Sequence, residues 1–351
     1  MDANGGGQTD SGDAPAIETA GLRKVYAGKR TPPKVALQSV DLRVPRGSIF
    51  GLLGPNGAGK SSLINILAGL VVKSAGTARI CGWDIDREMR KARASIGVVP
   101  QELNLDAFFT PREVMELQAG FYGIPKRERR TMEILRALSL DDKANLPPRS
   151  LSGGMRRRLL VAKALVHNPP VVILDEPTAG VDVELRQELW VYMRELNDAG
   201  TTILLTTHYL EEAQEMCDEI AIINHGEIVV QDRTPALLAR LDRKEARIVV
   251  DRDLAEIPPD LFDGMGPAID ATIENKREIL VRFPPSQVRM GALLDAIKGA
   301  GLHIQDLSTR DTDLEDIFVT LTAKTPEEPL ADRGDDPMAG SMERLRSTPR
   351  P

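Results

Sequence analysis

The sequence predicts an α/β fold for residues 17–239, because short apolar runs alternate with segments of helical periodicity. Residues 40–44 and 48–53 have the composition of strands. Residues 60–70 place Leu63, Ile66, Leu67 and Leu70 on one face, as in a helix. Residues 171–174 are continuously apolar, which is typical of a strand buried on both faces of a mostly parallel sheet.

Three further segments complete this expected domain. Residues 202–205 form another apolar run, and residues 220–224 and 227–231 flank His225 and Gly226 in the manner of a β-hairpin. Residues 111–146 instead carry helical periodicity without a strand signal. We therefore predict a helical subdomain, about residues 108–150, inserted into the α/β core.

A smaller α+β unit is expected over residues 240–324. Its strand-like and helical segments lie at residues 246–250, 271–274, 279–283, 290–299 and 313–321. Residues 1–16 are rich in Gly, Asp, Ser and Ala, and residues 325–351 in Pro, Glu, Gly, Asp and Arg. Both tails offer little to bury and are expected to be disordered.

Charge and composition narrow the class of protein. The net charge of −7 argues against a nucleic-acid-binding surface. Two basic runs, residues 126–130 and 156–158, are interpreted as solvated helix faces. Cys81 and Cys217 form no CxxC pair, which argues against a disulfide framework or a cysteine zinc site and fits a reducing compartment.

The ends of the chain and its apolar runs bear on location. The N-terminal residues show neither a basic segment nor an apolar segment of the kind found in secretory signals. No apolar run approaches the roughly 20 residues that a membrane-spanning helix needs. The expected location is therefore the cytoplasm, unless a partner holds the protein at a membrane.

A glycine-rich segment between an expected strand and an expected helix matches the pattern GxxxxGK[ST]. Its glycines allow successive backbone N–H groups to point inward, and the following helix adds its positive dipole end, so the segment suits the phosphates of a nucleotide. The lysine can reach the β and γ phosphates and the first serine hydroxyl can bind Mg²⁺. The segment comprises Gly54, Pro55, Asn56, Gly57, Ala58, Gly59, Lys60, Ser61 and Ser62.

Two carboxylates end the apolar run 171–174. Ligand groups in α/β sheets gather at the carboxyl ends of strands, so Asp175 is placed to hold Mg²⁺ and Glu176 to polarise a water for attack on the γ-phosphate. The pattern is weak alone, since many apolar strands end in acidic residues. Together with the phosphate-binding segment upstream, however, the pattern favours these roles for Asp175 and Glu176.

Residues 151–155, Leu-Ser-Gly-Gly-Met, identify the subclass. They resemble the LSGGQ signature of the ABC (ATP-binding cassette) family, with Met155 in place of glutamine. Because an amphipathic helix follows, Ser152, Gly153 and Gly154 form a second anion-binding helix start. In the ABC family two domains pair head-to-tail around two ATP molecules, so the resemblance implies that these three residues complete the site of a second copy.

Other positions match the family one by one. Gln101 resembles the glutamine that contacts Mg²⁺ or the attacking water, and His208 resembles the histidine that contacts the γ-phosphate. Asp182 resembles an aspartate that reaches across the dimer. Tyr26 is placed like the aromatic residue that stacks on adenine.

The resemblance implies an ABC ATPase core with an N-terminal antiparallel β subdomain, ATP and Mg²⁺ as ligands, and an integral membrane permease as partner. Residues 178–186 and 314–322 look like those of ATPases in drug, polysaccharide and nodulation-factor exporters. The protein is thus expected to power an exporter from the cytoplasmic face of the membrane.

Two other functions compete with the transporter ATPase. A soluble ABC ATPase acting on ribosomes or DNA stays open as the alternative. It is disfavoured by a single set of motifs, by the roughly 90 residues between phosphate segment and signature, and by the acidic balance. A GTPase or small-molecule kinase would leave Ser152–Gly154 without a role, and residues 275–278 break the guanine-reading NKxD pattern.

Overall fold

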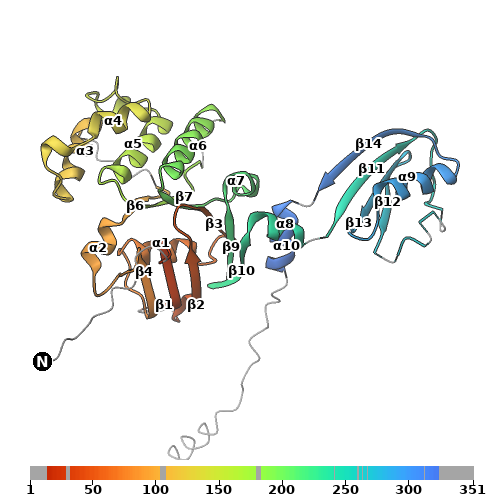
Figure 1. Ribbon diagram of the computed structural model, residues 1–351, viewed down its shortest axis with the longest axis horizontal. Coiled ribbons are helices and arrows are strands. Elements are labelled where there is room, and N and C mark those ends of the chain that lie inside the picture. Colours follow the sequence, from red (N-terminus) through yellow and green to blue (C-terminus); the bar gives the residue numbers. More distant parts are fainter. Residues whose placement is uncertain are drawn as a thin grey trace, which may run out of the picture.

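The computed structural model describes residues 14–28, 32–102, 108–178, 183–240, 242–258, 261–262, 264–266, 268–311 and 313–323. A larger unit carries a ten-stranded sheet and a smaller unit a four-stranded one (Figure 1). The strands of the larger sheet run in the order β5-β4-β1-β2-β10-β9-β3-β8-β7-β6. Their bounds are β1 (Ile17–Tyr26), β2 (Lys34–Val44), β3 (Ile49–Leu53), β4 (Ala75–Ile80), β5 (Trp83–Asp84), β6 (Ile96–Val99), β7 (Val171–Asp175), β8 (Thr202–Thr206), β9 (Glu219–Asn224) and β10 (Glu227–Arg233).

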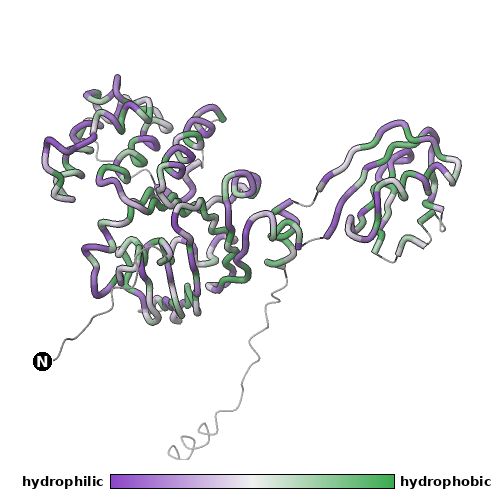
Figure 2. Tube along the Cα trace, viewed as in Figure 1, coloured by the Kyte–Doolittle hydropathy of each residue, from purple (hydrophilic) through white to green (hydrophobic). Residues whose placement is uncertain are grey.

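The parallel half of this sheet fixes where the loops meet. β9, β3, β8, β7 and β6 pair in parallel, and every residue of β3 and β8 is buried. The middle of the larger unit is correspondingly coloured as hydrophobic in Figure 2. Because parallel strands end at the same edge, the segments after β3, β6, β7 and β8 come together there. The mostly parallel sheet predicted from the apolar runs is confirmed for this half.

The other half is antiparallel. β1 pairs with β2 and β4. A single parallel pairing, of Ser39 in β2 with Glu227 in β10, connects this half to the rest of the sheet. Helix α1 (Lys60–Leu67) packs between the two halves through Leu63, Ile66 and Leu67. The helix is shorter than the predicted 60–70, because Gly69 adopts a φ of 69° that ends it.

The described residues within 108–150 form helices joined by turns and irregular segments, and no strand. Thr110 and Glu113 form a capping box at the start of α3, where Pro111 takes the first helical position. Helix α5 follows this subdomain and packs on β6. The helices of the larger unit, besides α1, are α2 (Met89–Ala94), α3 (Pro111–Phe121), η1 (Lys126–Glu128), α4 (Thr131–Ala137), η2 (Pro148–Ser150), α5 (Gly153–Leu165), α6 (Val183–Asp198), α7 (Leu210–Met216) and α8 (Thr234–Arg240).

The smaller unit has its own core, in which α9 (Met290–Gly299) covers one face of a sheet of order β12-β13-β11-β14. Sequence analysis assigned no strand to residues 304–311, which form an edge strand in which residues 305–310 are exposed. The bounds are β11 (Lys244–Val250), β12 (Asp270–Asn275), β13 (Glu278–Phe283) and β14 (Ile304–Asp311).

The last helix among the described residues, α10 (Leu314–Ala323), packs on the larger unit rather than on the small sheet. Leu314 is fully buried and Ile317 nearly so in the core that α7 and α8 share. The Leu314 N–H donates to Gln214 Oε1 at 3.1 Å. The predicted range 240–324 thus contains an excursion that starts after α8 and returns to the larger unit at α10.

Within the described residues, the search for a helix both long and apolar enough to cross a bilayer finds none.

Leu314→Ala should lower the free energy of unfolding of the larger unit by about 3 kcal/mol, because it opens a cavity in a packed core. Both tryptophans, Trp83 and Trp190, lie in that unit, so their fluorescence during urea unfolding reports it selectively. Val319→Ala, at a 62%-exposed position of the same helix, is the control and should change little. Equal unfolding midpoints for the two variants would contradict the anchoring of α10.

Candidate active site

The phosphate-binding segment forms a tight loop between β3 and α1. A Cβ on Gly54 would lie 2.2 Å from the Ile223 carbonyl oxygen, so only glycine fits against β9. The Gly226 N–H donates to the Ala58 carbonyl at 2.8 Å, which fastens the loop to the β9–β10 turn. Gly57 has a φ of +84° and faces open space, which leaves one side of the loop for a ligand.

Lys60 lies along this loop with its side chain almost fully buried. Its Nζ donates to the carbonyls of Gly54 at 2.5 Å and Pro55 at 3.2 Å. Burial lowers the pKa of the Lys60 ammonium, and the charges of Glu176 and Asp175 oppose that shift. An anion in the loop would supply the countercharge that this buried ammonium lacks in its direct bonds.

The loop opens into a cavity of about 220 Å³. The Tyr26 hydroxyl lies 3.3 Å from Ser62 Oγ, and Lys24 Nζ lies 4.6 Å from the centre of the Tyr26 ring. The predicted aromatic residue is therefore beside the phosphate loop. The cavity is lined by Tyr26, Lys34, Ala36, Asn56, Gly57, Ala58, Gly59, Lys60, Ser61, Ser62, Gln101 and Glu176.

Thr206, at the end of β8, positions the two carboxylate residues that end β7. Its hydroxyl donates to Asp175 Oδ1 at 2.6 Å, and its carbonyl accepts from the Glu176 N–H at 3.1 Å. Burial raises the pKa of Asp175, while the hydrogen bond from Thr206 opposes the rise. Sequence analysis did not single out Thr206, although it directly precedes Thr207 and His208.

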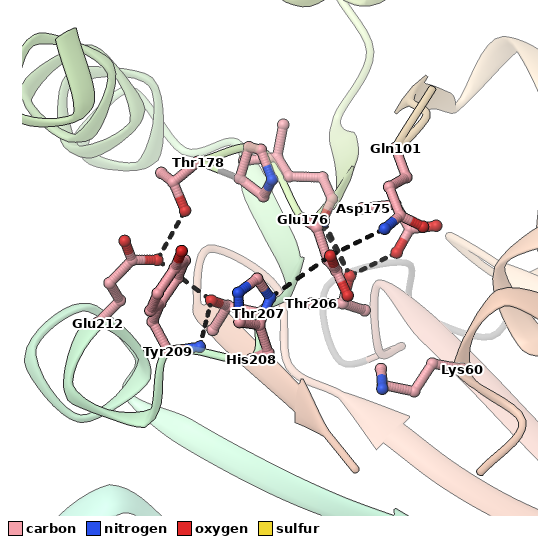
Figure 3. Close-up of polar contacts among 12 residues, drawn as sticks. Lys60, Gln101, Asp175, Glu176, Thr178, Thr206, Thr207, His208, Tyr209 and Glu212 are labelled. Carbon is pink, nitrogen blue, oxygen red and sulfur yellow. Dashed lines mark hydrogen bonds and ion pairs between the residues drawn. The ribbon is translucent and has the colours of Figure 1, made fainter. Parts of the chain in front are cut away.

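Glu176 is the meeting point of three loops (Figure 3). Its Oε2 accepts from Gln101 Nε2 at 2.9 Å and lies 3.4 Å from His208 Nδ1. Its backbone φ of 48° is unusual for a residue with a side chain, and such strain clusters at functional sites. The structure thus brings Gln101, Glu176 and His208 together beside the phosphate loop.

A third carboxylate, that of Glu212 in α7, was missed by sequence analysis. Its Oε2 accepts from the hydroxyls of Thr178 at 2.9 Å and Thr207 at 3.2 Å. Arg186 Nε lies 3.2 Å from Glu212 Oε1 as an ion pair without hydrogen-bond alignment. Glu212 thereby links the residue before the segment 179–182 to the loop that carries His208 (Figure 3).

The signature residues lie at the start of α5. Ser152 caps the helix, its Oγ accepting from the Met155 N–H at 3.2 Å, and Ser152 and Gly153 are exposed. Together with Gly154 they stand apart from the lining of the cavity around the phosphate loop. Asp182 lies outside the described residues.

The interpretation of both basic runs as solvated helix faces was wrong in part. Arg157 is 4% exposed and donates to main-chain carbonyls of the loops that hold Gln101 and Glu176. Arg129 is also partly buried, bonded to Glu116 at 2.6 Å. Neighbours such as Arg127 and Arg156 are exposed as expected. Arg157 lies on the packed face of α5, whereas Arg129 lies between η1 and α4.

A groove of about 330 Å³ lies between the helical subdomain and the sheet. In it the Tyr122 and His167 rings stack at 3.7 Å, and His167 Nε2 lies 3.1 Å from the Ile96 carbonyl oxygen. His167 Nδ1 is buried and has no hydrogen-bond partner among the described residues. Near this groove, Leu70 and Phe121 are strongly exposed, at 75% and 84%.

Comparison with known proteins places these features in a family. The family model described as "ABC transporter" matches residues 37–179. Nod factor export ATP-binding protein I of Ralstonia nicotianae is 35% identical over 315 residues, which cover 89% of this chain and 95% of that protein. Daunorubicin/doxorubicin resistance ATP-binding protein DrrA of Streptomyces peucetius is 36% identical, covering 88% of this chain and 92% of that protein.

A solved structure agrees with the sequence relatives. The dimeric post-hydrolysis state of the ATP-binding cassette MJ0796, bound to ADP and Pi, aligns with a TM-score of 0.56 and 27% identity. The alignment covers 62% of this chain and 98% of that one.

The partly buried His167 should make the free energy of unfolding depend on pH. Burial lowers the pKa of His167 from 6.5 to about 4. Between these values the unfolded chain binds a proton that the folded one excludes, so the free energy of unfolding falls as the pH drops from 6.5 to 4. His167→Phe, which keeps a ring against Tyr122, should therefore flatten the plot of urea midpoint against pH in that window.

The exposed His303 provides the control, since His303→Phe should leave the wild-type slope in place. If His167→Phe kept that slope as well, His167 would not be the group responsible.

Proposed function

Since the chain belongs to the ABC transporter family as an ATP-binding, ATP-hydrolysing subunit, we propose that it powers export through a separate integral membrane permease. The observation that carries the proposal is the meeting of Gln101, Glu176 and His208 beside the phosphate loop. The direction of transport rests on relatives that are named for Nod factor export and for drug resistance.

In the proposed site the phosphate loop and Lys60 bind the ATP phosphates, and Tyr26 stacks on adenine. Glu176 is the general base that polarises the attacking water, with Gln101 and His208 orienting that water and the γ-phosphate. Support comes from the position of Glu176, whose carboxylate is on the cavity wall and is held by side chains of two other loops.

Mg²⁺ is proposed to bind through Ser61, Asp175 and Gln101 together with phosphate oxygens. These residues offer oxygen ligands, which Mg²⁺ prefers. Among the described residues no cluster of three or more His, Cys, Asp or Glu could hold a metal alone, which suits an ion that takes much of its shell from nucleotide and water. The ion would also offset the burial that raises the pKa of Asp175.

A head-to-tail dimer is proposed as the hydrolysing unit. Ser152 and Gly153 are exposed at a helix start, apart from the chain's own phosphate loop. A helix start binds anions through its free N–H groups, so the residues suit the phosphate of a nucleotide held by a second copy. Asp182 is proposed to reach across the same interface.

The permease is proposed to dock at the groove between α3, α5 and β6, on the cytoplasmic side of the membrane. Pro100, which directly precedes Gln101, lines this groove. Exposed Leu70 lines this groove, and exposed Phe121 directly precedes Tyr122 of its lining. Phe108 and Phe109, before α3, are 86% and 38% exposed and offer further apolar contacts.

Glu176→Gln should lower ATP turnover at least 100-fold, because an amide cannot accept the proton of the attacking water. ATP binding and ATP-induced dimerisation, followed by calorimetry and light scattering, should persist. The same change at an exposed position, Glu128→Gln, is the control and should keep wild-type turnover. Turnover within twofold of wild type in Glu176→Gln would exclude Glu176 as the base.

Capture of the tagged chain from detergent-solubilised membranes should bring down a multi-span membrane protein. Phe121→Asp should reduce this capture at least tenfold, since it places a charge in the proposed apolar contact. Val191→Asp, at an exposed position of α6, should not. Recovery of ribosomes or DNA instead would favour a soluble ABC ATPase and contradict the transport function.

A further inference from the structure

Arg157 of α5 joins two loops of the site through main-chain carbonyls. Its Nη1 donates to the carbonyls of Pro100 at 2.9 Å and Gln101 at 2.8 Å. Its Nε donates to the Pro177 carbonyl at 2.9 Å, and its Nη2 donates to the Glu176 carbonyl. One guanidinium therefore bridges the backbone that carries Gln101 and the backbone that carries Glu176.

The chemistry of these contacts requires an arginine. A buried charge is costly unless its donors are satisfied, and here they are satisfied by carbonyl oxygens rather than by a carboxylate. The fixed fork of a guanidinium can bond two loops at once, whereas a lysine ammonium is a single point on a flexible stem. Burial lowers the pKa of Arg157, and the negative charges of Asp175 and Glu176 oppose that shift because they stabilise the charged guanidinium.

The same contacts act where the backbone is strained. Glu176 has a positive φ, which turns its carbonyl toward Arg157 while its carboxylate meets Gln101 and His208. A left-handed residue with a side chain persists only where its surroundings hold it. Arg157 and Thr206 hold this turn from its two sides, through the carbonyl and the N–H of Glu176.

We propose that Arg157 is a positioning residue that fixes Gln101 and Glu176 relative to each other and couples their placement to the orientation of α5. The coupling rests on the proposed dimer, in which Ser152–Gly154 contact the nucleotide of the second copy. Arg157 follows Ser152 on α5 by five residues, about 7.5 Å along the axis. One rigid helix then connects the nucleotide of the second copy to the catalytic pair of the first.

The test compares Arg157→Gln and Arg157→Lys with Arg158→Gln in the full-length protein. Arg158 is a matched control, because it is a largely buried arginine of the same helix that bonds Leu138 and Glu188, away from the two loops. Both Arg157 variants should lower kcat at least tenfold and change the KM for ATP less than threefold, since Arg157 is outside the cavity lining. Arg158→Gln should keep kcat within threefold of wild type.

Two further readouts separate positioning from a merely structural role. In a double-mutant cycle with Gln101→Ala, the combined loss of kcat should stay close to the larger single loss, because both changes act on one arrangement. The Hill coefficient for ATP should fall toward 1 in Arg157→Lys. This variant keeps the buried charge, so it tests the proposal even if Arg157→Gln fails to fold. Tryptophan fluorescence melts verify folding.

The proposal is overturned if Arg157→Lys is folded and has a kcat within threefold of wild type, or if its KM alone rises. An unchanged Hill coefficient overturns the coupling. Lys60→Ala and Glu176→Gln run in parallel keep this failure distinct from that of the proposed function. If Glu176→Gln retains turnover, the assignment of the base has failed; if it is inactive while the Arg157 variants are wild-type, only the role of Arg157 has failed.

Discussion

The parallel pairing of β3, β8 and β7 is the constraint on which the site depends. Leu52 aligns with Thr206 across β3 and β8, and Asp175 aligns with Thr206 across β8 and β7. This register delivers the phosphate loop, the carboxylates and His208 to one edge of the sheet. A shift of one residue would turn every side chain of a strand to the opposite face of the sheet. The register of these strands therefore also decides which side chains reach the site.

Thr206 shows how packing and chemistry meet at one residue. It is the last residue of a fully buried strand. Its hydroxyl contacts Asp175, which ends the neighbouring strand, and its carbonyl contacts Glu176, which follows that strand. The loop carrying His208 begins directly after it. A change at this position would therefore disturb the core and both carboxylate residues together.

Much of this arrangement follows from the sequence. Apolar runs located β3, β7 and β8, and the residues after them were predicted to form the site because parallel strands end at one edge. The role of Gln101 and His208 came instead from family resemblance, since neither has a local pattern that predicts it. Their contacts with Glu176 depend on how three loops fold toward one another, which no local pattern encodes.

Arg157 and Glu212 are two residues whose buried contacts the sequence does not predict. A run of three arginines indicates a solvated face, yet Arg157 lies three and four residues before buried Leu160 and Val161, on the packed side of α5. That periodicity was visible in the sequence, but charge outweighed it in the interpretation. The sequence does not distinguish Glu212 from its exposed neighbour Glu211, because its partners Thr178 and Arg186 come from the segment after β7 and from helix α6.

The return of α10 to the larger unit has an architectural consequence. The smaller unit is joined at both its beginning and its end to neighbouring helices, α8 and α10, and so is spliced into the ATPase rather than appended to it. A unit that is attached through two connecting segments is less free to rotate than a unit attached through a single linker. Because the cost of closing a longer loop rises only slowly with its length, such a splice point can host modules of different size while the catalytic unit keeps its final helix.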